Sequence, residues 1–180
     1  VSGDAGTPAA PADRTVMSEA EIHAVCDVAH DFEKRVAAHA RSAESVKRCL
    51  HFGVAILYHA TLLDQEAKDM LSAARETVFV APTLGNLYAT LHEAGAWGMS
   101  VETGRARGLE HELEQGIECM KDLRRRGVRI LPGGDYGFAW NPIGANARDI
   151  EHFVKLLDFT PMEAIVAATR LGGEIMMRGH

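Results

Sequence analysis

Apolar residues recur at helical spacing soon after the start of the chain. Ser18-Glu19-Ala20-Glu21 has the form of a capping box, in which a hydroxyl and a carboxylate each bind a free backbone N–H. The apolar positions after it lie three or four residues apart: Ile22, Val25, Cys26, Ala29 and Phe32. This spacing predicts a helix. Residues 1–17 are rich in Gly, Ala and Pro and lack such a period, so they are predicted to form a leader or loop.

Beyond residue 34, short apolar runs alternate with helical periodicity. The apolar runs predict strands at 35–39, 54–58, 77–81 and 128–131. The periodic segments predict helices at 42–52, 64–74, 108–126 and 146–157, with Asn146 as a cap, and a last helix from Thr160. Residues 83–107 are predicted to be a long connection that could contain a short helix around 87–93.

This order of elements indicates the fold class. Strands that alternate with helices are typical of an α/β fold with a parallel sheet and helical crossovers. A complete (β/α)₈ barrel takes about 250 residues. The 180 residues of this chain therefore have room for about half of such a barrel.

Composition and charge narrow the function classes. The chain is 47% hydrophobic and 24% charged, which is typical of a folded domain, and its net charge of −6 favours neither nucleic acid nor an anionic membrane. No apolar run approaches the roughly 20 residues that span a bilayer, and residues 1–4 lack the features of a signal peptide. Three widely spaced cysteines predict buried thiols in a reducing compartment. We therefore expect a cytoplasmic protein.

Three residues with metal-binding side chains are predicted at the same end of the sheet. His39 ends the first predicted strand, His59 follows the second, and Asp135 follows the fourth. Neighbouring strands lie about 4.8 Å apart, so side chains at their ends can reach one ion. Two histidines and an aspartate suit zinc, with Mn²⁺, Co²⁺ or Fe²⁺ as alternatives. The competing interpretation is that each histidine is structural.

The same segments resemble the amidohydrolase superfamily, and most closely its imidazolonepropionase and Xaa-Pro dipeptidase-like branch. The similar motifs are Val36-Ala-Ala-His39-Ala-Arg41-Ser42, Leu57-Tyr58-His59, and Leu131-Pro-Gly-Gly-Asp135-Tyr-Gly-Phe-Ala-Trp140. The segment from Phe159 to Thr169 is also similar to the helix that follows the last strand of the family's barrel. The resemblance extends from residue 18 to the end of the sequence.

The resemblance implies a TIM-type (β/α)₈ barrel, of which this chain covers about strands five to eight and their helices. Residues 1–17 would follow strand four, and 18–180 would form the C-terminal half of the barrel. His39 and His59 match the family's ligands on strands five and six, and Asp135 matches the aspartate on strand eight. The chain has no His-x-His pair and no lysine at a strand-four position, so the resemblance implies only part of the metal site.

The implied activity is metal-dependent hydrolysis of C–N bonds in a small-molecule amide, dipeptide-like or cyclic amide substrate. One or two divalent ions, zinc first among them, would activate water, and Asp135 would act as the base. The alternatives are a non-catalytic half-barrel that serves as a binding or assembly subunit, and a half that needs a complementary N-terminal half. Exposed sheet edges also predict a homo-oligomer.

Four further side chains are candidates for contacts with the substrate. Arg41 could bind a carboxylate, although a salt bridge to a helix acid is the more common role of such an arginine. Tyr136 and Trp140 could form an apolar or aromatic wall, or they could pack in the core. His92 lies in the predicted long connection and could reach a substrate from there.

Overall fold

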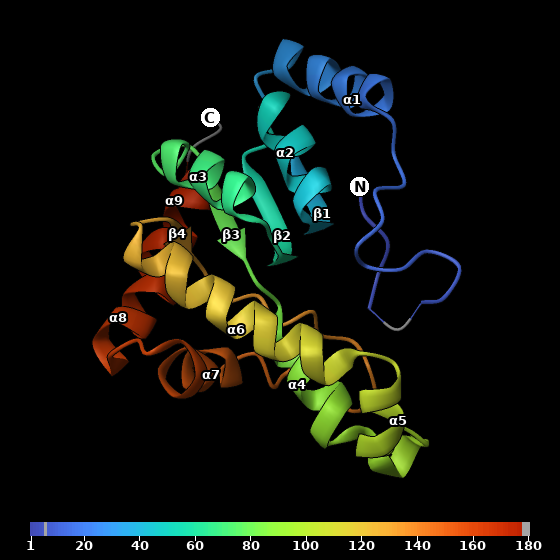
Figure 1. The fold of residues 1–180 in the computed structure, drawn as a ribbon. Coiled ribbons are helices and arrows are strands. Elements are labelled where there is room, and N and C mark those ends of the chain that lie inside the picture. Colours follow the sequence, from blue (N-terminus) through green and yellow to red (C-terminus); the bar gives the residue numbers. More distant parts are fainter. Residues whose placement is uncertain (6, 178–180) are drawn as a thin grey trace.

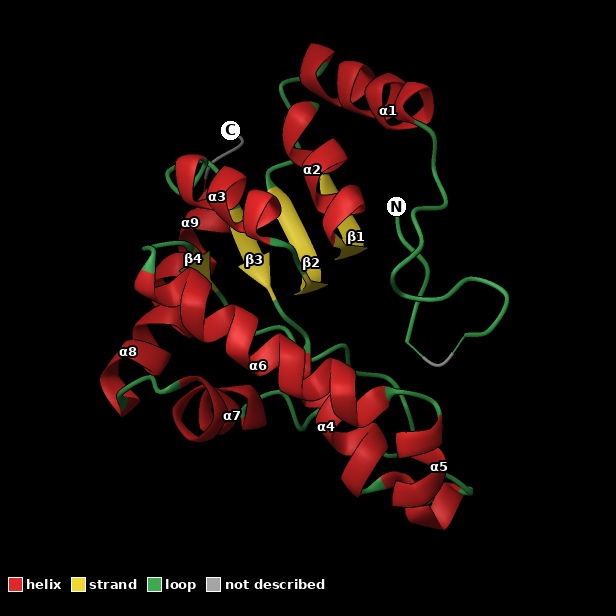
Figure 2. Cartoon of the chain, in the orientation of Figure 1, coloured by secondary structure: helices red, strands yellow, loops and turns green. Residues whose placement is uncertain are grey.

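A parallel sheet forms the centre of the molecule in the computed structural model, which describes residues 1–5 and 7–177. Within these ranges the sheet has four strands in the order β1-β2-β3-β4. The strands are β1 (Ala37–Ser42), β2 (Ile56–Leu62), β3 (Phe79–Ala81) and β4 (Arg129–Ile130). Figures 1 and 2 show them side by side, joined by helical connections. The predicted α/β class and the parallel sheet are confirmed; the assignment to strands five to eight of a barrel stays a prediction.

Helices occupy the segments where the periodic pattern predicts them. They are α1 (Glu19–Asp31), α2 (Ala43–His51), α3 (Gln65–Ala73), α6 (Leu109–Arg125), α7 (Arg148–Leu157), α8 (Pro161–Val166), the π-helical turn η2 (Ala167–Leu171) and α9 (Gly172–Met177). Capping boxes open α1 at Ser18 and α8 at Thr160. The predicted cap at Asn146 is wrong. Ala147 occupies the cap position of α7, and the Asn146 side chain instead accepts the Gly144 N–H at 3.1 Å.

The segment 83–107 is not an extended connection. It contains α4 (Leu84–His92), the short 3₁₀ helix η1 (Ala94–Trp97) and α5 (Val101–Ala106). Leu84, Leu87 and Leu91 are buried on one face of α4, at the spacing of successive helical turns. The four glycines of the segment and the polar residues between them hide this period in the sequence. The short helix considered around 87–93 is therefore present, and it begins three residues earlier, directly after β3.

The core lies between the sheet and the helices on one of its faces. In Figure 1, α2, α3 and α6 lie across the front of the strands. Leu57 and Val80 are fully buried in the core cluster that these helices share with the sheet. Tyr58, the next residue along β2, points to the other face and is 41% exposed. The sheet is therefore covered on one face and partly open on the other.

The ends of the strands also differ from prediction. The strand predicted at 35–39 lies at 37–42, so His39 is inside β1 rather than at its end, and His59 is inside β2. The ladder continues through polar residues, because Ser42 still pairs with Leu62. An apolar run therefore underestimates how far these strands extend. Among the described residues, no helix combines the length and the apolar character needed to cross a membrane.

Candidate active site

Unusual backbone conformations gather at one end of the sheet. Non-glycine residues with positive φ include His59 at 77° in β2, Thr83 at 56° after β3, and Asp135 at 56° after β4. Left-handed backbone costs a residue with a Cβ of the order of 1–3 kcal/mol and is concentrated at functional sites. Each of these residues follows or lies in a different strand. Together they indicate a functional site at this end of the sheet.

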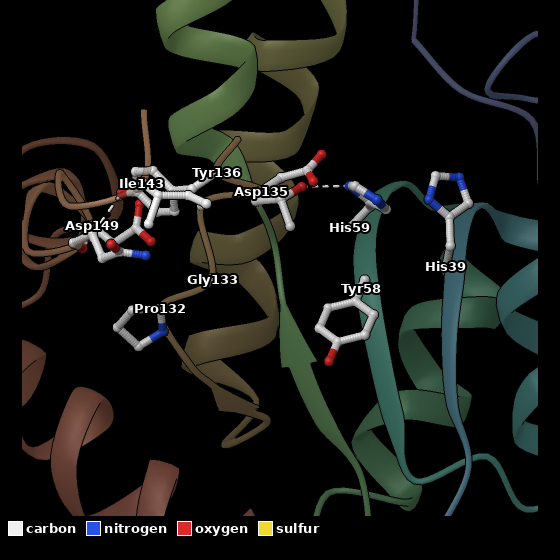
Figure 3. Close-up of a pocket in the computed structure, with 12 residues that line it drawn as sticks. His39, Tyr58, His59, Pro132, Gly133, Asp135, Tyr136, Ile143 and Asp149 are labelled. Atoms are coloured by element: carbon white, nitrogen blue, oxygen red, sulfur yellow. Dashed lines mark hydrogen bonds between the residues drawn. The ribbon is translucent and has the colours of Figure 1, made fainter. Parts of the chain in front are cut away.

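The strained residues line one cavity of about 620 Å³. Its wall comes from β1, β2, the start of α4, the loop after β4, and α7, as Figure 3 shows. The lining residues are His39, Tyr58, His59, Thr83, Pro132, Gly133, Gly134, Asp135, Tyr136, Ile143, Asn146 and Asp149. A cavity of this size fits a small organic molecule.

A bulge in β2 turns His59 toward the cavity. The register of β1 and β2 shifts between Ala40, which pairs with His59, and Ser42, which pairs with Leu62. His59 and Ala60 both have positive φ at this point. Such bulges re-aim side chains beside active sites. The local distortion thus explains why both Tyr58 and His59, which are adjacent in the strand, line the same cavity.

The two predicted histidines are in contact. Their ring centroids lie 4.3 Å apart in an edge-to-face arrangement, on the neighbouring strands seen in Figure 3. The Nε2–H of His39 donates to the Gly3 carbonyl oxygen at 2.9 Å, since a carbonyl can only accept. The lone pair of His39 is therefore on Nδ1. Nδ1 of His59 is hydrogen-bonded to the Thr83 hydroxyl.

The environment of His59 keeps its imidazole neutral. The side chain is 4% exposed, and burial, followed by the nearby charge of Arg41, lowers its pKa to about 2. A low-dielectric surrounding disfavours the charged ring, and a neighbouring cation disfavours it further. The neutral imidazole is the form that binds metal ions.

Asp135 is held from two sides. Its carboxylate accepts a hydrogen bond from the Asn86 amide at 3.1 Å. The buried Asn141 side chain donates to the main-chain oxygens of Gly134 and Asp135 at 2.9 and 3.1 Å. A Cβ on Gly134 would lie 2.4 Å from the Tyr136 ring, so only glycine fits before the aspartate. The loop thus fixes the position of Asp135.

Tyr136 and Asp149 form another part of the wall. Asp149 lies in the first turn of α7 and is 5% exposed. Burial and the Asp149 carboxylate raise the pKa of the Tyr136 phenol above its usual value. The phenol therefore remains protonated, and its hydroxyl donates to the Asn146 carbonyl oxygen at 3.4 Å. It can donate to a ligand only in place of this bond, because a phenol has a single O–H.

The arrangement supplies part of a metal site. In the described part of the chain, no group of three or more His, Cys, Asp or Glu side chains is placed to hold a metal ion. The structure brings His39 and His59 together, and the Asp135 carboxylate is bonded to Asn86 instead. Two adjacent imidazoles, one of them held neutral, fit two ligand positions of a divalent cation. The remaining ligands would have to come from elsewhere.

Of the four predicted substrate contacts, the structure places Tyr136 in the cavity wall and the other three elsewhere. Arg41 is 1% exposed, and its guanidinium pairs with Glu112 of α6 at 2.6 Å and with Asp4 at 2.7 Å. This is the salt bridge to a helix acid that we expected as the more common role of such an arginine.

His92 and Trp140 are not among the described residues that line the cavity either. His92 ends α4, and its ring packs against Tyr88 with centroids 4.7 Å apart. The Trp140 indole donates to Thr90 at 2.9 Å and stacks on Phe138. Both side chains are occupied by packing within the protein.

Sequence reasoning missed three residues of the site. Thr83 follows β3 by two residues, so the rule that singled out the other strand ends could have found it. Asn86 and Asp149 carry no comparable signal in the sequence. Their places depend on which faces of α4 and α7 turn toward the cavity, and this is decided by packing between distant segments.

Comparison with known proteins supports a relation to hydrolases. No protein-family model and no curated protein sequence matches this chain. Solved structures do match. A prolidase complexed with N-methylphosphonate-L-proline has a TM-score of 0.82 and 26% identity, over 98% of this chain and 41% of that one. A proposed prolidase from Bifidobacterium longum has a TM-score of 0.82 and 28% identity, over 99% of this chain and 44% of that one.

Ochratoxinase from A. niger shares the fold, with a TM-score of 0.79 and 21% identity, over 94% of this chain and 36% of its own. The chain thus has a mixed α/β fold with a parallel sheet that matches amidohydrolase-type hydrolases. One of these matches is a prolidase and another a proposed prolidase, and the chain spans about two fifths of their length.

Proposed function

We propose that this chain is the C-terminal half of an amidohydrolase-type barrel that hydrolyses C–N bonds of a small amide, dipeptide-like or cyclic amide substrate. The observation that carries the proposal is the cavity around His59, Thr83 and Asp135, three residues with left-handed backbone at one end of a parallel sheet. Active sites of parallel α/β folds occupy this end. The similarity to prolidases supports the same reaction class.

In this proposal, His39 and His59 hold a divalent cation, with zinc as the first candidate. A bound divalent cation lowers the pKa of water and makes hydroxide available near neutral pH. The hydrogen bond from His39 Nε2–H to the Gly3 carbonyl oxygen leaves Nδ1 of that ring for a ligand bond. Thr83 occupies Nδ1 of His59, so Nε2 is the nitrogen left for the cation. The two hydrogen bonds orient both rings, as partners of metal-bound histidines do.

The carboxylate and the phenol take the remaining roles. Asp135 accepts the proton of the attacking water and passes it to the leaving amine. The raised pKa of Tyr136 keeps its hydroxyl protonated, and this hydroxyl exchanges its hydrogen bond to the Asn146 carbonyl oxygen for one to the substrate. A cavity of about 620 Å³ has room for a dipeptide-sized molecule.

The open sheet supports the idea of further strands. β1 and β4 are the outer strands of the described sheet, and Tyr58 is exposed on the uncovered face. Outer strands leave unpaired backbone groups that favour pairing with another segment. We propose that strands outside this sequence, in the same polypeptide or in a complementary chain, complete the barrel and supply the missing ligands.

Zinc binding tests the proposed function first. The measurement is bound zinc after equilibrium dialysis, for the wild-type chain and for His39→Ala/His59→Ala. We expect about one equivalent that is lost in the double variant. His23→Ala/His51→Ala is the matched control, because both histidines are exposed on helices away from the cavity. Equal zinc binding by all three proteins would contradict the assignment of His39 and His59 as ligands.

Activity tests the role of Asp135. Dipeptides with a C-terminal proline and simple N-acyl amino acids are the substrates to try, with the chain alone and with a complementary N-terminal half. We expect Asp135→Asn to lower kcat by at least about 100-fold, because a positioned acid–base group contributes 10²–10⁴-fold. Unchanged kcat in this variant would rule out Asp135 as the base.

A further inference from the structure

A chain of hydrogen bonds leads from an aromatic side chain to the proposed base. The Trp140 indole N–H donates to the Thr90 hydroxyl at 2.9 Å. The Thr90 hydroxyl donates to the Asn86 side-chain oxygen at 3.2 Å, and the Asn86 amide donates to the Asp135 carboxylate at 3.1 Å. This series of hydrogen bonds begins at Trp140 in the loop after β4, passes through two residues of α4, and ends at Asp135 in the same loop.

The direction of each bond follows from the groups that make it. An indole nitrogen can only donate, so the oxygen of Thr90 accepts and its proton is free for the next link. That proton requires an acceptor, which fixes the side-chain oxygen of Asn86 toward Thr90. The NH₂ group of Asn86 must then face Asp135. The chain therefore presents a donor, and never an acceptor, to the Asp135 carboxylate.

Both ends of the chain are held in place. Asn86 and Thr90 are four residues apart on α4, so they lie on one face of a single helix. Trp140 stacks on Phe138 at 5.4 Å between centroids and contacts Trp97 of η1 at 6.3 Å. A rigid helix and an aromatic cluster thus support a carboxylate that is itself exposed to solvent.

We propose that Asn86, Thr90 and Trp140 are positioning residues that orient the Asp135 carboxylate toward the cavity. The inference rests on the proposed function, in which Asp135 handles the proton. The chain holds one carboxylate oxygen and leaves the other for the attacking water or for a cation. Without it, the carboxylate of an exposed aspartate rotates freely about its last side-chain bond.

A purely structural role would look different. The bonds could simply tie α4 to the loop, and in that case a break at Thr90 would not be felt at Asp135. Thr90 is the informative position, because it binds both Asn86 and Trp140 but has no hydrogen bond to Asp135. Thr90→Val keeps the shape and removes the hydroxyl, and Thr90→Ser restores the hydroxyl.

The test reads the carboxylate directly by nuclear magnetic resonance. The carboxyl ¹³C signal of Asp135, assigned with Asp135→Asn, is compared at fixed pH in the wild type, Thr90→Val, Thr90→Ser and Asn86→Ala. We expect Thr90→Val to move this signal toward its position in Asn86→Ala, and Thr90→Ser to return it. Thr169→Val is the matched control, because the Thr169 hydroxyl donates to the Ile165 carbonyl oxygen of α8.

Zinc affinity, measured by competition with a chromophoric chelator, gives the second readout. It tests whether the free Asp135 oxygen joins His39 and His59 as a ligand. In that case loss of the partner behind the carboxylate should weaken zinc binding about tenfold in Thr90→Val, and Thr90→Ser should leave it unchanged. An Asp135 carboxyl ¹³C signal that does not move in Thr90→Val would overturn the positioning role. If the wild type binds no zinc, the proposed function fails, and the carbon signal still decides whether the chain orients Asp135.

Discussion

The buried ion pair between Arg41 and Glu112 gives the sharpest quantitative prediction. The guanidinium Nη1 lies 2.6 Å from Glu112 Oε1, and the two side chains are 2% and 8% exposed. Arg41→Met removes the cation and keeps most of the volume of the side chain. The Glu112 carboxylate then keeps the Thr61 hydroxyl, at 3.0 Å, as a hydrogen-bond donor. One neutral hydrogen bond does not compensate a buried charge.

The magnitude follows from this desolvation. Breaking a buried ion pair by removing one partner costs about 3–5 kcal/mol, because the other charge is left in a low dielectric. The second partner of Arg41, Asp4, is 54% exposed and can turn to water, so its loss adds about 1 kcal/mol or less. We therefore expect Arg41→Met to lower the free energy of unfolding by about 3–5 kcal/mol.

Replacing both charges should behave differently from replacing one. In Arg41→Met/Glu112→Leu no charge remains buried, and apolar replacements of buried ion pairs are often neutral or stabilising. The double variant should therefore regain most of the loss. Such strong non-additivity is the signature of two residues in direct contact.

The assay is urea unfolding followed by circular dichroism, with Arg48→Met as the control. Arg48 pairs with Glu44 at 2.7 Å, almost the same distance, but these side chains are 27% and 53% exposed. An exposed pair of this spacing contributes about 0.3–0.5 kcal/mol. If Arg41→Met costs no more than Arg48→Met, the argument from burial is refuted and a functional role for Arg41 becomes open again.

Three further predictions concern pH, packing and thiol chemistry. Because the pKa of His59 is lowered, the unfolded chain binds a proton below about pH 6.5 that the folded protein does not, so the free energy of unfolding decreases as the pH is lowered. Between pH 7 and 5 this proton accounts for about 2 kcal/mol of the decrease. We expect His59→Gln to abolish that part, as measured by urea unfolding at each pH. A matching slope in both proteins would contradict the buried neutral ring. Gly85→Ala places a Cβ 2.7 Å from Asp149 Oδ1 and should cost about 1–3 kcal/mol of unfolding free energy, whereas Gly95→Ala meets nothing within 4 Å and should be nearly neutral. Burial raises the pKa of the three cysteine thiols, Cys26, Cys49 and Cys119. Ellman's reagent should therefore react slowly with the native protein and detect all three thiols only after denaturation. Rapid reaction with the native protein would show that at least one thiol is accessible.

The sequence predicts part of the site because strand ends obey a simple geometric rule. His39 and His59 are twenty residues apart, one strand–helix unit, so parallel pairing brings them to neighbouring positions. The register sets His39 opposite Tyr58, and the bulge at His59 completes the approach of the two rings. The same rule applies to Thr83, which follows β3. It does not extend to the Asp135 carboxylate, whose partner Asn86 comes from a helix that no strand rule locates.

Local hydrogen bonding and periodicity can therefore be predicted from the sequence alone. The capping boxes at Ser18 and Thr160, the alternation of strands and helices, and the parallel sheet depend on residues a few positions apart, so a short window of sequence contains their cause. A resemblance to one family added the reaction class, and the fold is consistent with it.

The burial and the partners of individual polar side chains depend on contacts between distant segments. Arg41 can be buried because Glu112 of α6, seventy-one residues away in the sequence, forms an ion pair with it. Asn86 reaches Asp135 because the leucines of α4 turn one face of that helix into the core and leave the other toward the loop. Burial and pairing are properties of neighbours that only packing brings together, and a charged group in low dielectric depends on those neighbours more than on its own identity.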